Sequence, residues 1–427
     1  MMRRVALVLA VAVPVIFSAV FNCVHAGEID LLLEKLVDKG VLTPGEAQQI
    51  GVETKEQVKA EIAAGKSSSL PAWVQNMKLK GDLRLRYQYK HDKAANNYSK
   101  DTQIGRLRMR LGLDTKVNEK IMVGVGIATN SDGDPRSTNM TFGKSGDGYS
   151  TKMEIRLDNA YAKYDALPWL TIVGGKMLLK DALWEPTDLV WDTDITPEGG
   201  VLQFDKKLNS NTSLFMNTGV LIQTDDTSSD NDPVMMYIIQ PGATYKINDS
   251  MSLKGAFTAN IGSNTKGTAY PTGDWYKSSN TKNGSNWAYD YRTISPALEL
   301  SLKEPFKAAG LDIENMKLFG EYVKNLAVSS NNSGFSLGFQ LGNDKISKFG
   351  DWQFRYIYAM LEKDAVLDVT PDSDRYSGKT GMRSHEAALS YGLGKNTFLG
   401  LDVYRSWSLI GSRAPETLVQ VDWNLKF

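Results

Sequence analysis

The chain has 427 residues, with one cysteine and three histidines, and its 49 basic and 49 acidic residues give a formal net charge of zero. This neutrality argues against a nucleic-acid-binding protein, because such proteins are usually basic. Beyond residue 26, no apolar run approaches the length of a membrane-spanning helix, which argues against a helical membrane protein. The 37 glycines and the aromatic content of 10% favour many twisted strands over a disordered chain.

Residues 1–26 are predicted to be a secretory signal peptide. Two arginines precede an apolar stretch from Val5 to Phe21, which is followed by the cleavage pattern Val24-His25-Ala26. A retained membrane anchor is the alternative, but the apolar stretch is short and contains Pro14. Cleavage would remove Cys23. An exported chain without disulfides fits a large barrel, which satisfies its own backbone hydrogen bonds.

A helical segment in the periplasm is predicted over residues 27–64, followed by a linker over residues 65–75. Apolar residues recur at helical spacing from Ile29 to Val37, and Gly40 ends this first helix. The stretch from Thr43 to Glu46 has the pattern of a capping box, with proline at the first helical position. The segment is too small for a core of its own. Its apolar stripe is therefore expected to pack on itself or on copies from neighbouring subunits.

Residues 76–427 alternate between apolar and polar side chains, the period of a β-strand. Leu83 and Leu85, for example, alternate with Arg84 and Arg86. Each predicted strand has at least the length needed to cross a bilayer at a tilt. The sixteen predicted strands are 77–90, 104–117, 120–130, 152–165, 168–179, 198–208, 212–222, 234–247, 250–262, 289–303, 315–326, 334–342, 350–361, 383–393, 396–407 and 416–427.

The connections between these strands alternate in length. Those after odd-numbered strands are mostly long and polar, whereas those after even-numbered strands are mostly short; 304–314 is an exception. Short periplasmic turns and long external loops are typical of outer-membrane barrels. We therefore predict an all-β fold, a transmembrane antiparallel up-and-down β-barrel of about 16 strands in the bacterial outer membrane.

Aromatic residues are expected to mark the two membrane interfaces, where tyrosine and tryptophan are favoured. The residues assigned to these interfaces are Tyr161, Tyr164, Trp169, Tyr237, Tyr289, Tyr291, Trp352, Tyr356, Tyr358 and Trp423. In the last strand, Trp423 and the terminal Phe427 share one apolar face. This pattern resembles the C-terminal signal through which the barrel-assembly machinery recognises its substrates.

Five stretches carry a family resemblance: Asp30 to Pro44, Leu70 to Tyr89, Leu167 to Met177, Thr196 to Gly199 and Leu318 to Tyr322. In this order, they resemble the putative porin family of Gram-negative bacteria. The resemblance implies an outer-membrane channel for small hydrophilic solutes, assembled as a trimer or similar oligomer. It does not specify the solute.

The polar face of an outer-membrane barrel lines its lumen. We therefore expect a basic wall made by Lys80, Arg84, Arg86, Arg106, Arg108, Arg110 and Arg156. After the fifth strand lies an acidic segment, and in porins the loop at this position often folds inward. Its candidate constriction residues are Asp181, Trp184, Glu185, Asp188, Trp191, Asp192 and Asp194. The hypothesis is an acidic lip facing the basic wall; the alternative is that the loop stays outside and the arginines pair with nearby carboxylates.

No catalytic residues, cofactor or metal ligands are predicted. The three histidines are His25 in the signal, His91 and His385, and alternation places His385 on the face opposite its neighbours. No nucleophile elbow, HExxH motif or glycine-rich phosphate loop occurs. The acidic stretches around Asp132 and Asp225 lack the spacing of a calcium-binding EF-hand and are interpreted as solvated loops.

The predicted function is passive diffusion of small hydrophilic solutes and ions through a water-filled barrel. The expected partners are outer-membrane lipid and lipopolysaccharide, other copies in a homotrimer and the barrel-assembly machinery, but no nucleic acid. A solute-specific channel for an anion or a sugar is the alternative, with an aromatic track drawn from Trp184, Trp191, Tyr270, Trp275 and Tyr276. An adhesin or structural barrel that uses its long loops is a third possibility.

Overall fold

The computed structural model describes residues 33, 35–63, 72–93, 99–130, 133–144, 149–224, 233–273, 275–411 and 414–427. The predicted signal peptide, residues 65–71 of the predicted linker, and the acidic stretch around Asp225 with Asp132 lie outside these residues. The chain divides into two compact units, Met1–Pro71 and Ala72–Phe427. None of the helices described is both long and apolar enough to span a membrane.

The first unit contains helix α2 (Pro44–Ala63). The predicted capping box is present at its start: Glu46 Oε2 accepts the Thr43 backbone N–H at 2.8 Å, and Thr43 Oγ1 accepts the Glu46 N–H at 3.3 Å. A Cβ built on Gly51 would lie 3.6 Å from Cδ1 of Leu33. Part of the apolar stripe therefore packs within the segment itself.

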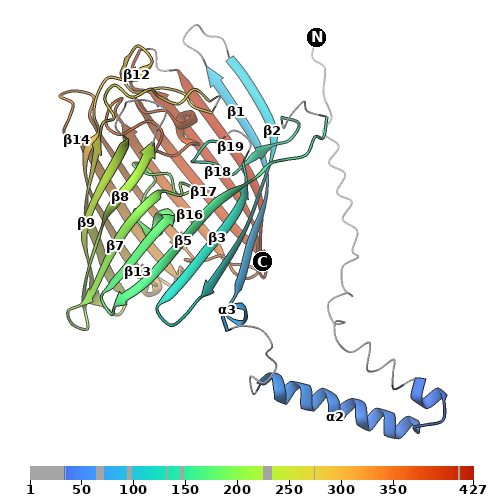
Figure 1. Ribbon diagram of the computed structural model, residues 1–427. Helices are drawn as coiled ribbons and strands as arrows, with labels where there is room; N and C mark the ends of the chain where they lie inside the picture. The colour runs from blue at the N-terminus through green and yellow to red at the C-terminus, as the bar shows by residue number, and fades with distance from the viewer. Residues whose placement is uncertain are drawn as a thin grey trace. The chain divides into compact units, whose positions relative to one another are not determined.

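The second unit is a closed antiparallel β-barrel (Figure 1). It starts with a short helix, α3 (Ala72–Gln75), at the end of the predicted linker. Among the described residues sixteen strands cross the wall, as predicted, and the short β4 pairs with β2. The strands are β1 (Lys78–Lys93), β2 (Ser99–Lys116), β3 (Ile121–Thr129), β4 (Met140–Thr141), β5 (Ile155–Leu167), β6 (Leu170–Lys176), β7 (Glu198–Lys207), β8 (Thr212–Thr224), β9 (Val234–Asn248), β10 (Met251–Ser263), β13 (Arg292–Lys303), β14 (Asn315–Asn325), β15 (Ser333–Gly342), β16 (Trp352–Leu361), β17 (Met382–Gly394), β18 (Thr397–Ser408) and β19 (Pro415–Lys426).

The remaining elements lie in the connections. The connection between β10 and β13 contains a two-stranded sheet, β11 (Lys282–Asn283) and β12 (Asn286–Trp287). Three short 3-10 helices are described: η1 (Leu179–Asp181), η2 (Lys307–Ala309) and η3 (Arg375–Gly378). Helix η2 occupies the turn 304–314, which explains why this turn is long at the end where the others are short.

The first and last strands close the barrel. Strand β1 pairs with β19 from Asp82 opposite Lys426 to Asp92 opposite Glu416. Beyond this ladder, the Gly81 N–H donates to the Phe427 carbonyl at 2.7 Å, and the Phe427 N–H donates back at 3.0 Å. A Cβ at Gly81 would overlap the ring of Phe427, so this ring packs directly over the glycine. The terminal residue predicted as an assembly signal thus lies at the seam, with Trp423 on the outer face of the same strand.

Alternation places charged residues inside the barrel and apolar residues outside it. On β1, Leu85 is 36% exposed on the outer face, whereas Arg86 is 6% exposed inside. On β17, Ser384 and Glu386 are buried and His385 between them is exposed, as alternation predicts. The long connections gather at one end of the barrel and the short turns at the other (Figure 1). In outer-membrane barrels, long connections of this kind lie at the external end.

Two of the aromatic residues assigned to the membrane interfaces are buried within the protein instead. Tyr161 is 5% exposed, and its ring covers Gly124 of β3. The β3–β5 register shifts between Gly126 and Ile127, and an extra residue in a strand reverses the alternation beyond it. Tyr291 is 1% exposed because it precedes β13 and packs within the external connection 264–291. Neither position is predictable from period-two alternation alone.

Candidate pore and inward loop

Strands β1 and β2 bring four arginines together on the inner wall. Arg84 lies opposite Arg108, and Arg86 lies opposite Arg106. Like charges directly across a strand pair repel each other, so this arrangement requires carboxylates nearby. The alternating sequence pattern of the two strands had indicated this shared face.

Carboxylates from the same wall meet several of these cations. Asp82 accepts a hydrogen bond from Arg108 at 2.9 Å and one from Arg110 at 2.8 Å. Asp422 of β19 accepts two from Arg86, at 2.7 and 2.8 Å. The bidentate pair fixes the guanidinium of Arg86 against the wall.

The other basic residues have weaker or more exposed partners. Arg84 donates to the Asn139 side chain at 2.7 Å, and its nearest carboxylate oxygen, on Asp422, is 3.7 Å away. Arg106 is 3.4 Å from Gln88 Oε1. The remaining two basic residues form ion pairs near water: Lys80 with Asp114 at 2.5 Å and Arg156 with Glu154 at 2.8 Å.

The connection between β6 and β7, which we call the inward loop (residues 177–197), turns into the barrel. The Gln240 side chain of β9 accepts the Trp184 N–H at 2.8 Å and donates to the Trp184 carbonyl at 2.9 Å. Thr187 donates to Glu321 of β14 at 2.6 Å. These bonds to inward-facing side chains hold the loop across the lumen.

An apolar cluster attaches the far side of this loop to the opposite wall. Leu189 and Trp191 from the loop are buried in one cluster with Ile357 and Ala359 of β16. A tryptophan in this position contributes mainly apolar burial and cannot line an aqueous track. Trp191 therefore does not belong to the expected aromatic track.

Three of the predicted loop carboxylates are used for anchoring and do not face the arginines of β1 and β2. Asp181 pairs with Lys163 at 2.6 Å. Asp192 accepts the backbone N–H of Ser373 at 3.0 Å. Asp188 pairs with Arg375 at 3.0 Å. The predicted lip is therefore less acidic than the sequence suggested, because tertiary partners occupy these groups.

Arg375 is the centre of the largest buried charge cluster around the inward loop. Its guanidinium lies 2.5 Å from Glu386 of β17, 3.0 Å from Asp188 and 3.7 Å from Asp372. Burial disfavours ionisation of Asp188, but the guanidinium outweighs it and lowers the pKa of that carboxyl. The three carboxylates lie close enough to hold a metal ion, but the arginine already supplies the positive charge among them. No sequence motif marks this cluster, since its members come from three separate segments.

Two further connections pack together at the external mouth. Asp368 accepts hydrogen bonds from the Tyr276 hydroxyl at 2.8 Å and from the Asn280 N–H at 2.9 Å, which joins connection 362–381 to connection 264–291. Arg136 donates to the Asp368 carbonyl at 3.2 Å and lies 5.6 Å from the centre of the Trp275 ring. Tyr276 and Trp275 thus support the mouth rather than a lumenal track.

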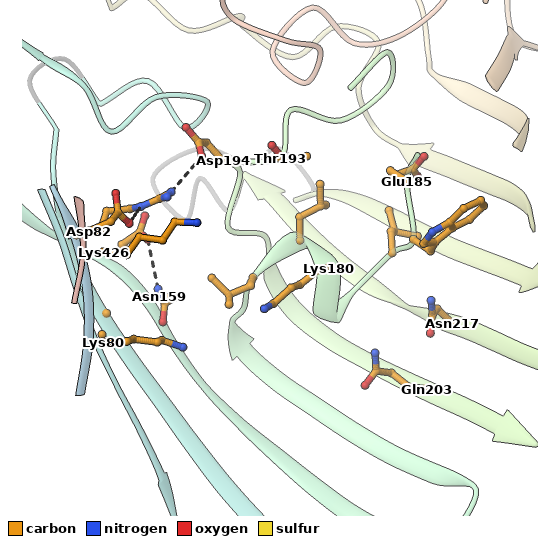
Figure 2. A pocket seen from close by; sticks show the side chains of 18 of the residues that line it. Lys80, Asp82, Asn159, Lys180, Glu185, Thr193, Asp194, Gln203, Asn217 and Lys426 are labelled. Carbon is orange, nitrogen blue, oxygen red and sulfur yellow. Dashed lines mark hydrogen bonds and ion pairs between the residues drawn. The ribbon is translucent and has the colours of Figure 1, made fainter. Parts of the chain in front are cut away.

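A cavity of about 1040 Å³ remains between the inward loop and the wall (Figure 2). Figure 2 shows Lys80 and Asp82 on one side, and Glu185 and Asn217 on the other. Asp194 is the predicted loop carboxylate that reaches the arginine wall, at 3.2 Å from Arg110. Opposite charges therefore meet at this border of the cavity, in the manner of the predicted lip.

On the other side of the cavity, a lysine ammonium contacts a pair of aromatic rings. The rings of Trp184 and Phe215 meet edge to face at 6.5 Å. The Lys254 ammonium lies 4.7 Å from the centre of the Trp184 ring and 5.0 Å from that of Phe215. Phe215 and Lys254 were not among the predicted site residues, although both lie at alternating positions of predicted strands.

Glu185 is partly exposed at the cavity, but its carboxylate oxygens are buried where the inward loop meets β14. Burial raises the pKa of this carboxyl well above its usual value, and the nearby carboxyl of Glu321 raises it further. Ionisation of both carboxyl groups would cost free energy, because both groups are buried away from water. The contact between loop and wall is therefore sensitive to proton uptake.

A closed sixteen-stranded barrel with an inward loop and a charged cavity is the architecture of a porin-type channel. The model of the putative porin family matches residues 41–103, 89–293 and 281–427. The chain therefore belongs to the putative porin family, and its fold is that of bacterial outer-membrane channels.

Solved porin structures align with this chain. The high-pH structure of Pseudomonas putida OprB aligns with a TM-score of 0.53 and 9% identity, over 83% of this chain and 95% of that chain. A triple mutant of the Rhodopseudomonas blastica porin aligns with a TM-score of 0.42 and 13% identity, over 82% of this chain and 100% of that chain. The comparison with curated proteins gives no match.

Proposed function

We propose that this porin lets small hydrophilic solutes and ions diffuse passively through its lumen, past a basic wall on β1 and β2. The observation that carries the proposal is the charged cavity between the inward loop and that wall. Arg110 is shared between Asp82 and Asp194 there, while Arg84 has an amide as its nearest partner. Charges beside a narrow path are poorly screened and therefore bias which ions pass.

Planar-bilayer recording of the refolded chain under a salt gradient tests this proposal. Stepwise conductance is expected, with a reversal potential that shows preference for anions. A folded barrel that conducts no current would contradict passive diffusion and favour a plugged lumen or a structural role.

A solute-specific channel is a second candidate, favoured by the cluster of Trp184, Phe215 and Lys254 beside the cavity. An aromatic face next to a cation suits a sugar ring that carries an anionic group. Block of the current by a uronic acid at millimolar concentration, lost in Trp184→Ala, would support it. Equal block by glucose and by the uronic acid would contradict the role of Lys254.

The proposed partners follow from the location in the outer membrane. We propose that the mature chain begins after residue 26, assembles as a homotrimer and is inserted through its C-terminal strand, with Trp423 and Phe427 exposed on the outer face. Lipopolysaccharide is the proposed lipid partner of the external half of the barrel.

A further inference from the structure

The outer face of the barrel carries a cationic and aromatic cluster on β17 and β18. His385 lies directly opposite Arg405, and Arg383 lies directly opposite Trp407. The residues between them, Ser384 and Ser406, are fully buried and hydrogen-bonded to each other inside the barrel at 2.7 Å. Alternation therefore directs Arg383, His385, Arg405 and Trp407 outward, toward the membrane.

This cluster lies at the external edge of the wall. Arg383 is the second residue of β17, which follows the long connection 362–381, and Trp407 is the penultimate residue of β18. External loops and the outer leaflet lie at this end of an outer-membrane barrel. The cluster is thus at the level of lipid head groups rather than acyl chains.

The contacts hold both arginines around one indole. The guanidinium carbons of Arg383 and Arg405 lie 5.6 and 5.4 Å from the centre of the Trp407 ring. The imidazole of His385 lies 5.8 Å from the same ring and 5.0 Å from Tyr358. These aromatic rings restrict the arginines without neutralising them.

Neither arginine forms an ion pair with a carboxylate of the described residues. In this they differ from the inward arginines Arg86, Arg108 and Arg375, each of which has a carboxylate within 3.0 Å. Arg405 donates to Thr417, a neutral partner. Two confined, uncompensated guanidinium groups at the rim of a membrane require an anion, and phosphate suits their planar donors.

Between this cluster and the membrane centre, the outer face of β17 and β18 is apolar and can contact acyl chains. Leu389 lies directly opposite Leu401 on the same two strands, and these side chains are 43% and 41% exposed on the outer face. The surface thus presents two cations at the head-group level and an apolar track beneath them. A lipid with phosphate near its acyl chains matches both parts.

We propose that Arg383 and Arg405, held over Trp407, bind a phosphate of an outer-leaflet lipopolysaccharide whose acyl chains lie along Leu389 and Leu401. The inference deepens the proposed lipid partnership and rests on the proposed orientation in the outer membrane, but it does not depend on conduction. It names the residues that recognise this lipid and the chemical group that they recognise.

Native mass spectrometry of the refolded full-length chain in detergent tests the inference, with bisphosphorylated lipid A as the probe. The double variant Arg383→Gln/Arg405→Gln is expected to retain this lipid about tenfold less well than the unaltered chain. The Lys/Lys double variant should retain an intermediate amount, because it keeps the charges but loses the planar donors. Lipid A without phosphates should bind all three forms equally weakly.

Arg292→Gln is the matched control. Arg292 is also exposed at the external end, at the start of β13, but Asp290 lies 3.8 Å from it. This variant should bind lipid A like the unaltered chain. Equal lipid retention by the unaltered chain and the Gln/Gln variant would overturn the inference, as would stronger retention of phosphatidylglycerol than of lipid A.

Two more measurements distinguish a lipid site from a subunit interface and from a part of the pore. If the Gln/Gln variant loses its oligomeric state while each subunit keeps its lipid affinity, the face is a subunit interface and the inference is wrong. Single-channel conductance of the same variant should equal that of the unaltered chain. Failure of lipid binding with normal conductance would therefore refute this inference alone and leave the proposed channel function intact.

Discussion

The two sides of the lumen use the same residue types for opposite purposes. On the side of β14 to β17, Arg375 is 1% exposed and lies among three carboxylates, which anchor the inward loop. On the side of β1 and β2, Arg110 is 33% exposed and borders the cavity. Burial turns an ion pair into a structural anchor, whereas partial hydration leaves its field available to passing ions.

The comparison shows that counts of acidic and basic residues do not define a pore. Of the seven loop residues singled out from the sequence, Asp181, Asp188, Trp191 and Asp192 anchor the loop. Trp184, Glu185 and Asp194 border the cavity. Whether a loop residue anchors the loop or borders the cavity depends on its partner across the barrel.

The largest effect is expected from removal of the buried anchor. Arg375→Ala removes the cation that is paired directly with Asp188 and Glu386 and leaves only the charge of Arg355 near them, at a cost of up to about 3–5 kcal/mol. The inward loop should detach, which would raise single-channel conductance and expose the loop to proteases. Arg292→Ala, an exposed arginine on the outer face, is the control and should change neither. Unaltered conductance in a folded Arg375→Ala barrel would show that the apolar cluster and the hydrogen bonds to Gln240 and Glu321 hold the loop without Arg375.

A second effect concerns the pH dependence of loop docking. The raised pKa of Glu185 means that the docked loop binds more protons than the free loop. Docking should therefore be strongest near or below the usual glutamate pKa of 4.5 and weaken as pH rises above it. We expect more frequent openings in bilayer recordings at higher pH, and less of this trend in Glu185→Gln. An identical pH profile in the two proteins would locate the titrating group elsewhere.

The wall of β1 and β2 should respond in selectivity and, because Arg86 is buried against Asp422, also in stability. Replacement of Arg84, Arg86, Arg108 and Arg110 by glutamine should shift the reversal potential in a salt gradient toward cation preference. The effect should shrink at high ionic strength, because charges that reach the water of the lumen, such as that of Arg110, are screened over about 10 Å at 0.1 M salt. Reversal potentials that do not move would show that these arginines are fully compensated by their carboxylates.

The smallest effect is expected for the ion pair between Asp194 and Arg110 at the border of the cavity. Asp194→Asn removes a partly exposed partner of Arg110, and such ion pairs contribute about 0–1 kcal/mol. Thermal stability should hardly change, while anion preference should increase slightly. A marked loss of thermal stability would mean that Asp194 anchors the loop, like Asp188.

Much of the fold was predictable because alternation is a local property. Period two along each segment predicted all sixteen wall strands, and the alternating lengths of the connections predicted that the long ones lie at one end of the barrel (Figure 1). Prediction failed where the period was interrupted, because the bulge opposite Gly126 turned Tyr161 inward. Local irregularities of this kind leave little trace in composition.

The sequence by itself determined the membrane barrel, the basic face shared by β1 and β2, and the acidic content of the inward loop. Each follows from residues close together in the chain. Only the tertiary structure decided which of those charges face water, because Arg375, Glu321 and Gln240 reach the loop from strands and connections far along the chain. Burial and ion pairing depend on such distant partners, and these two factors determine whether a charge anchors the loop or faces the water path.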